Sequence, residues 1–198
     1  MKRITACIII LIFLAAAVFS QDKKGSAALP GGYGSLTWGT LLSQARKNIT
    51  GKLIYTDEKS IIISRDRELE YRYGFFYTDP AVAAAAGTGK KDDTSKAPEE
   101  GKLFYVALSF PYLSMDDVKK KLQEKYGEPT NENITDNQGA LAWVSETTII
   151  VIWVDRYEKK AYSRRITYLS RKIARELNKY QENVFNATEL ELIKQLKP

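Results

Sequence analysis

Residues 114–129, SMDDVKKKLQEKYGEP, contain the most complete helix signal of the chain. Ser114 is a typical N-cap residue with Asp117 three positions later, while Gly127 and Pro129 are residues that end helices. Between these ends lie apolar side chains at helical spacing: Met115, Val118, Leu122 and Tyr126. The pattern predicts an amphipathic helix whose apolar stripe packs against the rest of the protein.

Strand signals precede and follow this helix. In residues 69–77 apolar and polar side chains alternate, so that one face carries Leu69, Tyr71, Tyr73, Phe75 and Tyr77. Shorter signals lie at 52–56, 60–64, 103–110, 140–144, 147–154 and 164–169. Short turns, and not crossover helices, join most consecutive strands. The sheet should therefore be mainly antiparallel, and the predicted fold class is α+β with helices packed on the sheet.

Three further helices complete the expected order of elements. The first covers 36–48 and is closed by Gly51, another begins at Ser170, and a short last helix follows Thr188. A helix followed by hairpin-linked strands thus occurs twice. This order predicts two similar α-β-β-β halves within a single domain over 35–198.

The central strands carry apolar residues on both sides. Residues 147–154 are apolar throughout, and aromatic side chains line one side of 69–77. Both features predict a sheet that is covered on both faces, by helices on one of them. The sequence does not determine what covers the second face. The alternatives are another sheet layer, the other half, a dimer mate or a ligand.

The N-terminus has the features of an export signal. Lys2 and Arg3 form a basic start, an apolar stretch follows, and residues 18–20 resemble a cleavage site. The uncharged stretch 4–19 is shorter than the roughly 20 residues that a membrane-spanning helix needs. We therefore expect a signal peptide over 1–20, cleavage after Ser20, and a periplasmic or secreted protein; an uncleaved N-terminal membrane anchor is the alternative.

Two segments have the composition of mobile chain. Residues 21–34 are polar and then glycine-rich, which predicts a flexible lead-in. Residues 79–101 combine alanines, glycines and runs of lysine and aspartate, which predicts a mobile loop. Because strands with aromatic residues flank this loop, we interpret it as a long hairpin connection and not as a domain boundary.

The composition removes several classes of chemistry. Histidine is absent, and the single cysteine, Cys7, lies within the export signal. Catalytic triads, zinc sites and disulfides therefore lack the residues that build them, and we expect no cofactor and no metal. The net charge is +6, or +4 without Lys2 and Arg3 (28 basic minus 24 acidic residues). This modest charge and the export signal disfavour a nucleic-acid partner.

A basic face on the helix that begins at Ser170 is the most suggestive surface feature. On a helical wheel its cations lie opposite the apolar Ile173 and Leu177, and two arginines of the preceding strand extend it. The predicted partner-binding residues are Arg164, Arg165, Arg171, Lys172, Arg175 and Lys179. Such a face suits an acidic envelope protein, an anionic cell-wall polymer or lipid headgroups.

Carboxylates are the remaining candidates for catalysis. A pair of them is enough for a cell-wall glycan hydrolase, which is the competing hypothesis. The acids on or beside predicted strands are Glu70, Glu146 and Asp155. Nothing in their spacing places two of them together, so solvent-facing strand and turn acids are the preferred interpretation.

One predicted helix ends in Lys125-Tyr126-Gly127-Glu128-Pro129, and a polar gap and then Ala142-Trp143 follow it. This arrangement resembles two kinds of small periplasmic fold. They are the beta-lactamase inhibitor protein and the outer-membrane assembly lipoproteins of the SmpA/OmlA type. Trp38-Gly39 is similar to the start of exported bacterial proteins on the same plan. The resemblance covers 38–168 in element order and implies helices on an antiparallel sheet and binding of other proteins. The lipidated cysteine of the lipoproteins and a counterpart of the 79–101 loop are missing. The expected function is an exported, non-catalytic envelope protein that binds another protein or an anionic envelope polymer.

Overall fold

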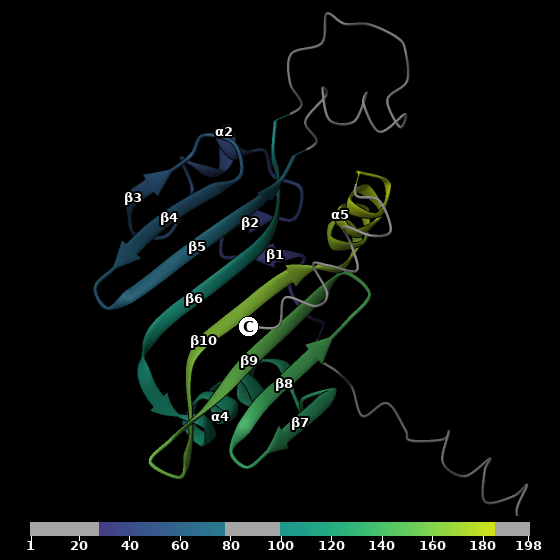
Figure 1. Ribbon diagram of the computed structural model, residues 1–198. Coiled ribbons are helices and arrows are strands. Elements are labelled where there is room, and N and C mark those ends of the chain that lie inside the picture. The colour runs from purple at the N-terminus through teal and green to yellow at the C-terminus, as the bar shows by residue number, and fades with distance from the viewer. Residues whose placement is uncertain (1–27, 78–99, 185–198) are drawn as a thin grey trace, which may run out of the picture.

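The structure is a computed structural model that describes residues 28–77 and 100–184, with side chains as far as residue 178. The elements in chain order are β1 (Gly32–Tyr33), β2 (Leu36–Thr37), α2 (Leu42–Ala45), β3 (Lys52–Thr56), β4 (Ile61–Asp66), β5 (Leu69–Phe76), β6 (Lys102–Ser114), α4 (Met115–Tyr126), β7 (Asn131–Thr135), β8 (Gln138–Val144), β9 (Thr148–Tyr157), β10 (Lys160–Ser170) and α5 (Arg171–Val184). Eight of the strands form one antiparallel sheet (Figure 1). The predicted α+β class is confirmed. In this part of the chain no helix is long and apolar enough to cross a membrane.

The large sheet consists of two successive meanders. Its strand order is β3-β4-β5-β6-β10-β9-β8-β7, so each meander contributes four hairpin-linked strands. The last strands of the two meanders, β6 and β10, pair antiparallel and join them, with Leu108 opposite Ile166. The second meander is preceded by the long helix α4, whereas the first is preceded only by the single turn α2. The similarity of the two halves therefore remains a prediction.

Helix α4 forms where the sequence predicts it. It begins after Ser114 and ends at Tyr126, and Gly127 adopts a φ of 78°, a conformation that favours glycine. Ser114 makes no capping hydrogen bond through its side chain, but two acidic residues in the first turn suit the positive end of the helix dipole. The predicted stripe is buried against the sheet at Val118, Leu122 and Tyr126.

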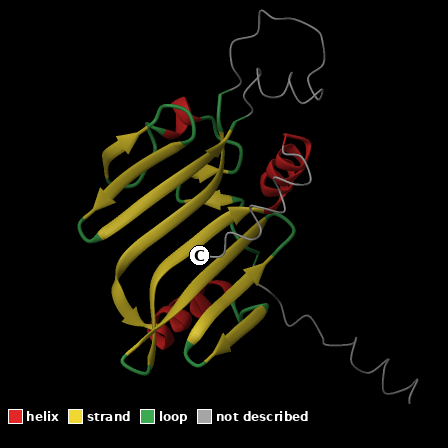
Figure 2. Cartoon of the chain, viewed as in Figure 1, coloured by secondary structure: helices red, strands yellow, loops and turns green. Residues whose placement is uncertain are grey.

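The core lies between this helix and one face of the sheet. Figure 2 shows α4 crossing behind the lower ends of the central strands, where it contacts β6 and β10. Strand alternation turns every second side chain toward it, and the largest fully buried ones are Trp143, Tyr73, Ile62, Leu103, Leu141, Ile150 and Ile152. The predicted alternation in β5 is confirmed, since Tyr71, Tyr73 and Phe75 are all buried.

The turn between β3 and β4 is built around one carboxylate. Asp57 accepts hydrogen bonds from the backbone N–H groups of Lys59, Ser60 and Ile61 and from the Ser60 hydroxyl. Desolvation by burial acts to raise the pKa of Asp57, but these hydrogen bonds outweigh it and lower the pKa well below its usual range. The polar residues 57–59 therefore form a defined turn and not a loose connection.

The helix predicted over 36–48 is wrong. Leu36 and Thr37 form β2, and only residues 42–45 are helical. The cause is pairing with the start of β6: Gly39 N–H donates to the carbonyl of Leu103, whose N–H donates to that of Thr40. These bonds use backbone groups that a helix would need, so tertiary contacts override the local periodicity.

The flexible lead-in predicted over 21–34 is corrected for its described part. Leu29 is buried, and Gly32 and Tyr33 pair with Thr37 and Leu36 in a small hairpin. A Cβ atom at Gly32 would clash with the carbonyl oxygen of Leu36. The glycine thus permits a close backbone contact, in place of the flexibility that its composition indicates.

Several predictions fall on residues that the structure does not describe. The signal peptide over 1–20, the mobile loop predicted over 79–101 except for its last two residues, and the helix predicted after Thr188 lie outside the described ranges. The flanking strands β5 and β6 do pair antiparallel, with Tyr73 opposite Val106. Residues 78–99 thus join two strands that are neighbours in one sheet.

Candidate binding surface on the open face of the sheet

One face of the eight-stranded sheet has no described element over its centre. Figure 1 shows the sheet from this side, with α4 behind it and α5 beyond its upper corner. In β9 the side chains toward α4 are buried, whereas Ile149 and Val151 on this face are half-buried and Trp153 is 42% exposed. Of the covers expected for this face, neither a second sheet layer nor the other half lies over its centre within the described residues, and a cover by a partner stays a prediction. We call this surface the open face.

Aromatic and arginine side chains gather on the open face where β6 and β9 end and β10 begins. Tyr112 and Tyr157 stack at 5.8 Å, and both contact Tyr162 edge-on. The guanidinium of Arg165 lies 5.0 Å from the centre of the Trp153 ring. The aromatic–arginine cluster consists of Tyr112, Trp153, Tyr157, Tyr162, Arg164 and Arg165.

A β-bulge places two consecutive arginines of this cluster at the surface. The pairing of β10 with both neighbours shifts register between Ser163 and Arg165. In a regular strand Arg164 and Arg165 would point to opposite faces, and one of them would enter the core. With the bulge both are exposed, while Ser163 and Ile166 on either side are buried.

The two arginines have different partners. Arg164 lies 5.3 Å from the Tyr112 ring centre and forms an ion pair of 3.6 Å with Asp155. Arg165 has no carboxylate partner among the described residues and stacks on Trp153. Together with Asp155 and Phe110 they line a hollow of about 300 Å³. Such a hollow can accept an acidic side chain, because a planar guanidinium binds carboxylates through two parallel hydrogen bonds.

Further charges cross the open face in one row. The strand register aligns Lys52, Arg65 and Glu70, and continues through Ser109 to Arg165. Glu70 pairs with Arg65 at 3.0 Å and with the neighbouring Arg72 at 3.5 Å. Lys52, Arg65, Arg72 and Arg165 carry four positive charges against the one of Glu70. The open face is therefore net positive at this end, and we call these five residues the basic row.

The six basic residues predicted as one binding face fall into two groups. Arg164 and Arg165 belong to the open face, about 20 Å of extended chain away from Arg171. Arg171 donates a hydrogen bond to the carbonyl of Ser145 at 2.8 Å, so it serves a structural contact. Lys172 and Arg175 are exposed on α5 and share a hollow with the acidic Glu146 and Glu176. Lys179 lies in the part of α5 without described side chains.

The predicted candidate acids do not come together. Glu70 on β5 and Asp155 on β9 are separated by β6 and β10, or about 14 Å at the usual strand spacing. Glycosidase pairs lie about 5 to 9.5 Å apart. Glu146 sits in the turn between β8 and β9. Over 28–77 and 100–184 there is also no cluster of three acids that would hold a metal ion.

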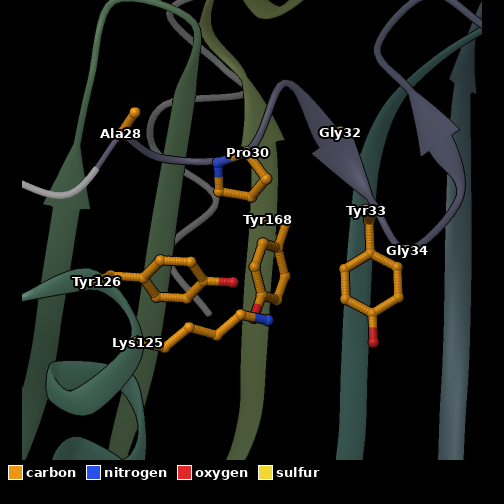
Figure 3. A pocket seen from close by; sticks show the side chains of 8 residues that line it. All are labelled: Ala28, Pro30, Gly32, Tyr33, Gly34, Lys125, Tyr126 and Tyr168. Atoms are coloured by element: carbon orange, nitrogen blue, oxygen red, sulfur yellow. The ribbon is translucent and has the colours of Figure 1, made fainter.

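A second hollow, on the face covered by α4, is lined by tyrosines (Figure 3). Tyr33 of β1 and Tyr168 of β10 meet edge to face at 4.9 Å, and Tyr126 of α4 points toward Tyr168. The Tyr168 hydroxyl interacts with that of Tyr126, and the Tyr33 hydroxyl with that of Tyr71. Desolvation by burial raises the pKa of Tyr33 and of Tyr168, and the neighbouring tyrosines add to the effect. We call this hollow the tyrosine pocket.

The raised pKa of Tyr168 predicts a loss of stability in alkali. Folded Tyr168 keeps a proton that the unfolded chain releases above about pH 10, so its contribution is complete below pH 10 and is lost as the pH rises. Between about pH 10 and 12 the free energy of unfolding should fall less steeply in Tyr168→Phe than in wild type. The difference in slope should be about 1.4 kcal/mol per pH unit. Urea unfolding at a series of pH values measures this slope. Tyr157→Phe is the exposed control, and equal slopes for wild type and Tyr168→Phe would contradict the prediction.

Comparison of the chain with protein-family models, with curated proteins and with solved structures gave no match.

Proposed function

We propose that the protein is an exported, non-catalytic binding protein of the bacterial envelope, and that the open face of its sheet contacts a partner protein. The observation that carries the proposal is an eight-stranded sheet with apolar side chains on both faces and described elements over only one of them. An apolar sheet face of this width is costly to leave in water, so it marks a surface that is covered by a partner.

The aromatic–arginine cluster supports a protein as the partner. Tryptophan, tyrosine and arginine are the residue types that dominate binding energy at protein interfaces. Trp153, Tyr112 and Tyr157 are 42%, 46% and 53% exposed, so their rings are available for further burial. The stacking of Tyr112 on Tyr157 and of Arg165 on Trp153 holds these rings in place before binding, which reduces the conformational entropy lost on association.

The basic row indicates the charge of that partner. Four cations face one carboxylate, and Arg165 is not paired with any described acid. An acidic protein surface would complement this charge and would speed association. The partner that fits best is therefore a protein with acidic residues around an apolar patch.

Site-specific photo-cross-linking in the native host tests this function. A benzophenone amino acid replaces Tyr55 in one variant and Trp153 in another, at positions five strand spacings apart, or about 24 Å, on the open face. Both variants should give an adduct with the same protein. The matched control places the probe at Glu124, which is exposed on α4 behind the sheet.

Three outcomes contradict the proposal. Adducts from Glu124 but not from the open face would place the interface elsewhere. Adducts of heterogeneous mass that respond to cell-wall hydrolases would identify an anionic polymer as the partner. Release of glycan fragments by the purified protein would favour the hydrolase hypothesis.

A further inference from the structure

The tyrosine pocket has the size and lining of a small-molecule site and lies on the opposite side of the sheet from the open face. Its volume is about 460 Å³, within the range of ligand sites in proteins. Its walls come from three separate elements, with Tyr33 from β1, Tyr126 from α4 and Tyr168 from β10. Three aromatic rings around one hollow suit a flat, apolar ligand body.

A positive charge stands at the edge of this pocket. Lys125 is exposed, and Figure 3 shows its side chain extending from α4 toward Tyr168, alongside that of Tyr126. Its ammonium lies 5.1 Å from the centre of the Tyr126 ring and has no carboxylate partner in the described part of the chain. Lys119 on the same helix, by contrast, pairs with Glu132 at 2.8 Å. The pocket thus has at its edge a cation that no described acid neutralises and that is free to pair with an anionic ligand.

The tyrosine hydroxyls add a hydrogen-bond donor. The hydroxyls of Tyr168 and Tyr126 interact, and together they carry two protons. A hydrogen bond between them uses at most one of these protons, so at least one O–H group is available to a ligand. A phenolic O–H next to an ammonium is a donor pair that suits a carboxylate.

The backbone around the pocket is held by close contacts. Gly32 approaches the carbonyl of Leu36 more closely than any other residue type permits, and Gly34 has a φ of 61°. Trp38 N–H donates to the carbonyl of Gly31 at 2.9 Å, which closes the β1–β2 hairpin. Tyr33 therefore projects from a fixed hairpin, and the pocket is formed before any ligand binds.

From these observations we propose that the tyrosine pocket binds a small aromatic carboxylate, with its ring against Tyr33 and Tyr168 and its carboxylate at Lys125 and the free tyrosine O–H. The site is independent of the open face, because the two lie on opposite sides of the sheet. Its ligand contacts none of the residues that the proposed function assigns to the partner protein.

Calorimetric titration of the purified protein with benzoate tests the proposal. Acetate has the charge without the ring, benzyl alcohol has the ring without the charge, and benzylamine has the opposite charge. Benzoate should bind at least about tenfold more tightly than any of the three. Lys125→Gln should weaken benzoate binding by about tenfold. Lys121→Gln, one turn earlier on α4 and outside the pocket, is the matched control and should leave the affinity unchanged.

Any of the following results would contradict the proposed site. Equal affinities for benzoate and benzyl alcohol would show that no anion is recognised, and equal affinities for benzoate and acetate would show that the rings are not used. Wild-type affinity in Lys125→Gln, or no benzoate binding at about 10 mM, would remove the site altogether. Because Lys125 is exposed, circular dichroism of this variant should match wild type and exclude misfolding as the cause.

Discussion

Replacing Trp143 by alanine should lower the free energy of unfolding by about 3–5 kcal/mol. Trp143 is 1% exposed and is the largest fully buried side chain of the described core. It lies on β8 opposite Ile150 of β9, on the sheet face that packs against α4. Its indole N–H also donates to the carbonyl of Gly127 at 2.7 Å, which ties the end of α4 to the sheet. The substitution therefore opens a cavity and leaves a partly buried acceptor without its partner.

The matched control is the same substitution on the other side of the sheet. Trp153→Ala removes an identical side chain from the open face and should cost about 1 kcal/mol or less, because Trp153 is partly exposed and its N–H bond to Thr167 is 3.2 Å long. Urea unfolding followed by far-UV circular dichroism compares the two variants. Equal losses would mean that the open face is as buried as the core. Trp143→Phe removes the hydrogen bond but keeps most of the side-chain volume, so its free energy of unfolding should fall by less than that of the alanine variant.

The sequence predicts the elements whose local signals agree with their tertiary surroundings. The α4 segment has a stripe, a cap residue and a terminal glycine that all indicate one helix, and the structure places that helix on the sheet. The alternation in β5 likewise matches its burial, since one side of that strand faces the core. Agreement between local propensity and global packing is what makes such elements predictable.

Other elements depend on contacts that a local pattern does not contain. Strand β7 has the sequence Asn-Glu-Asn-Ile-Thr, which carries no apolar alternation, because it is an edge strand held mainly by its backbone pairing with β8. The β1–β2 hairpin forms from glycine-rich chain through contacts such as the bond from Trp38 N–H to Gly31. The sequence predicts no strand over 131–135, and it predicts a flexible lead-in and the start of a helix where the hairpin forms, since neither element buries a periodic face of its own.

The residues of the open face also depend on contacts that a local sequence pattern does not contain. The apolar residues of 147–154 predict two apolar sides, but no pattern within one strand states whether both sides are covered. Arg164 and Arg165 were assigned to the basic face of α5 because they precede it in sequence. The bulge after Ser163 and the pairing of β10 with β9 place them beside Trp153 instead. Only the register of three strands brings the aromatic–arginine cluster together.

Once cross-linking has identified the partner protein, Trp153→Ala and Arg165→Ala should each weaken its binding by about 2 kcal/mol or more, which is roughly a thirtyfold increase in Kd. Both side chains lie in the middle of the surface that the partner would cover, and each supports the other through their 5.0 Å stacking contact. The double variant should therefore lose less than the sum of the single losses, because the two residues act as one unit. Surface plasmon resonance with the purified partner measures the three affinities.

Arg175→Ala on α5 is the control that decides between the two groups of basic residues predicted from the sequence. Arg175 is exposed and shares its hollow with Glu146 and Glu176, so acids of the protein itself already offset its charge. Its loss should change Kd by less than about threefold. The cations of the basic row other than Arg165 should act mainly on the rate of association, so Arg72→Ala should slow binding at low salt and have little effect at high salt. If Arg175→Ala greatly raised Kd while Arg165→Ala bound like wild type, the interface would lie on α5 and not on the open face.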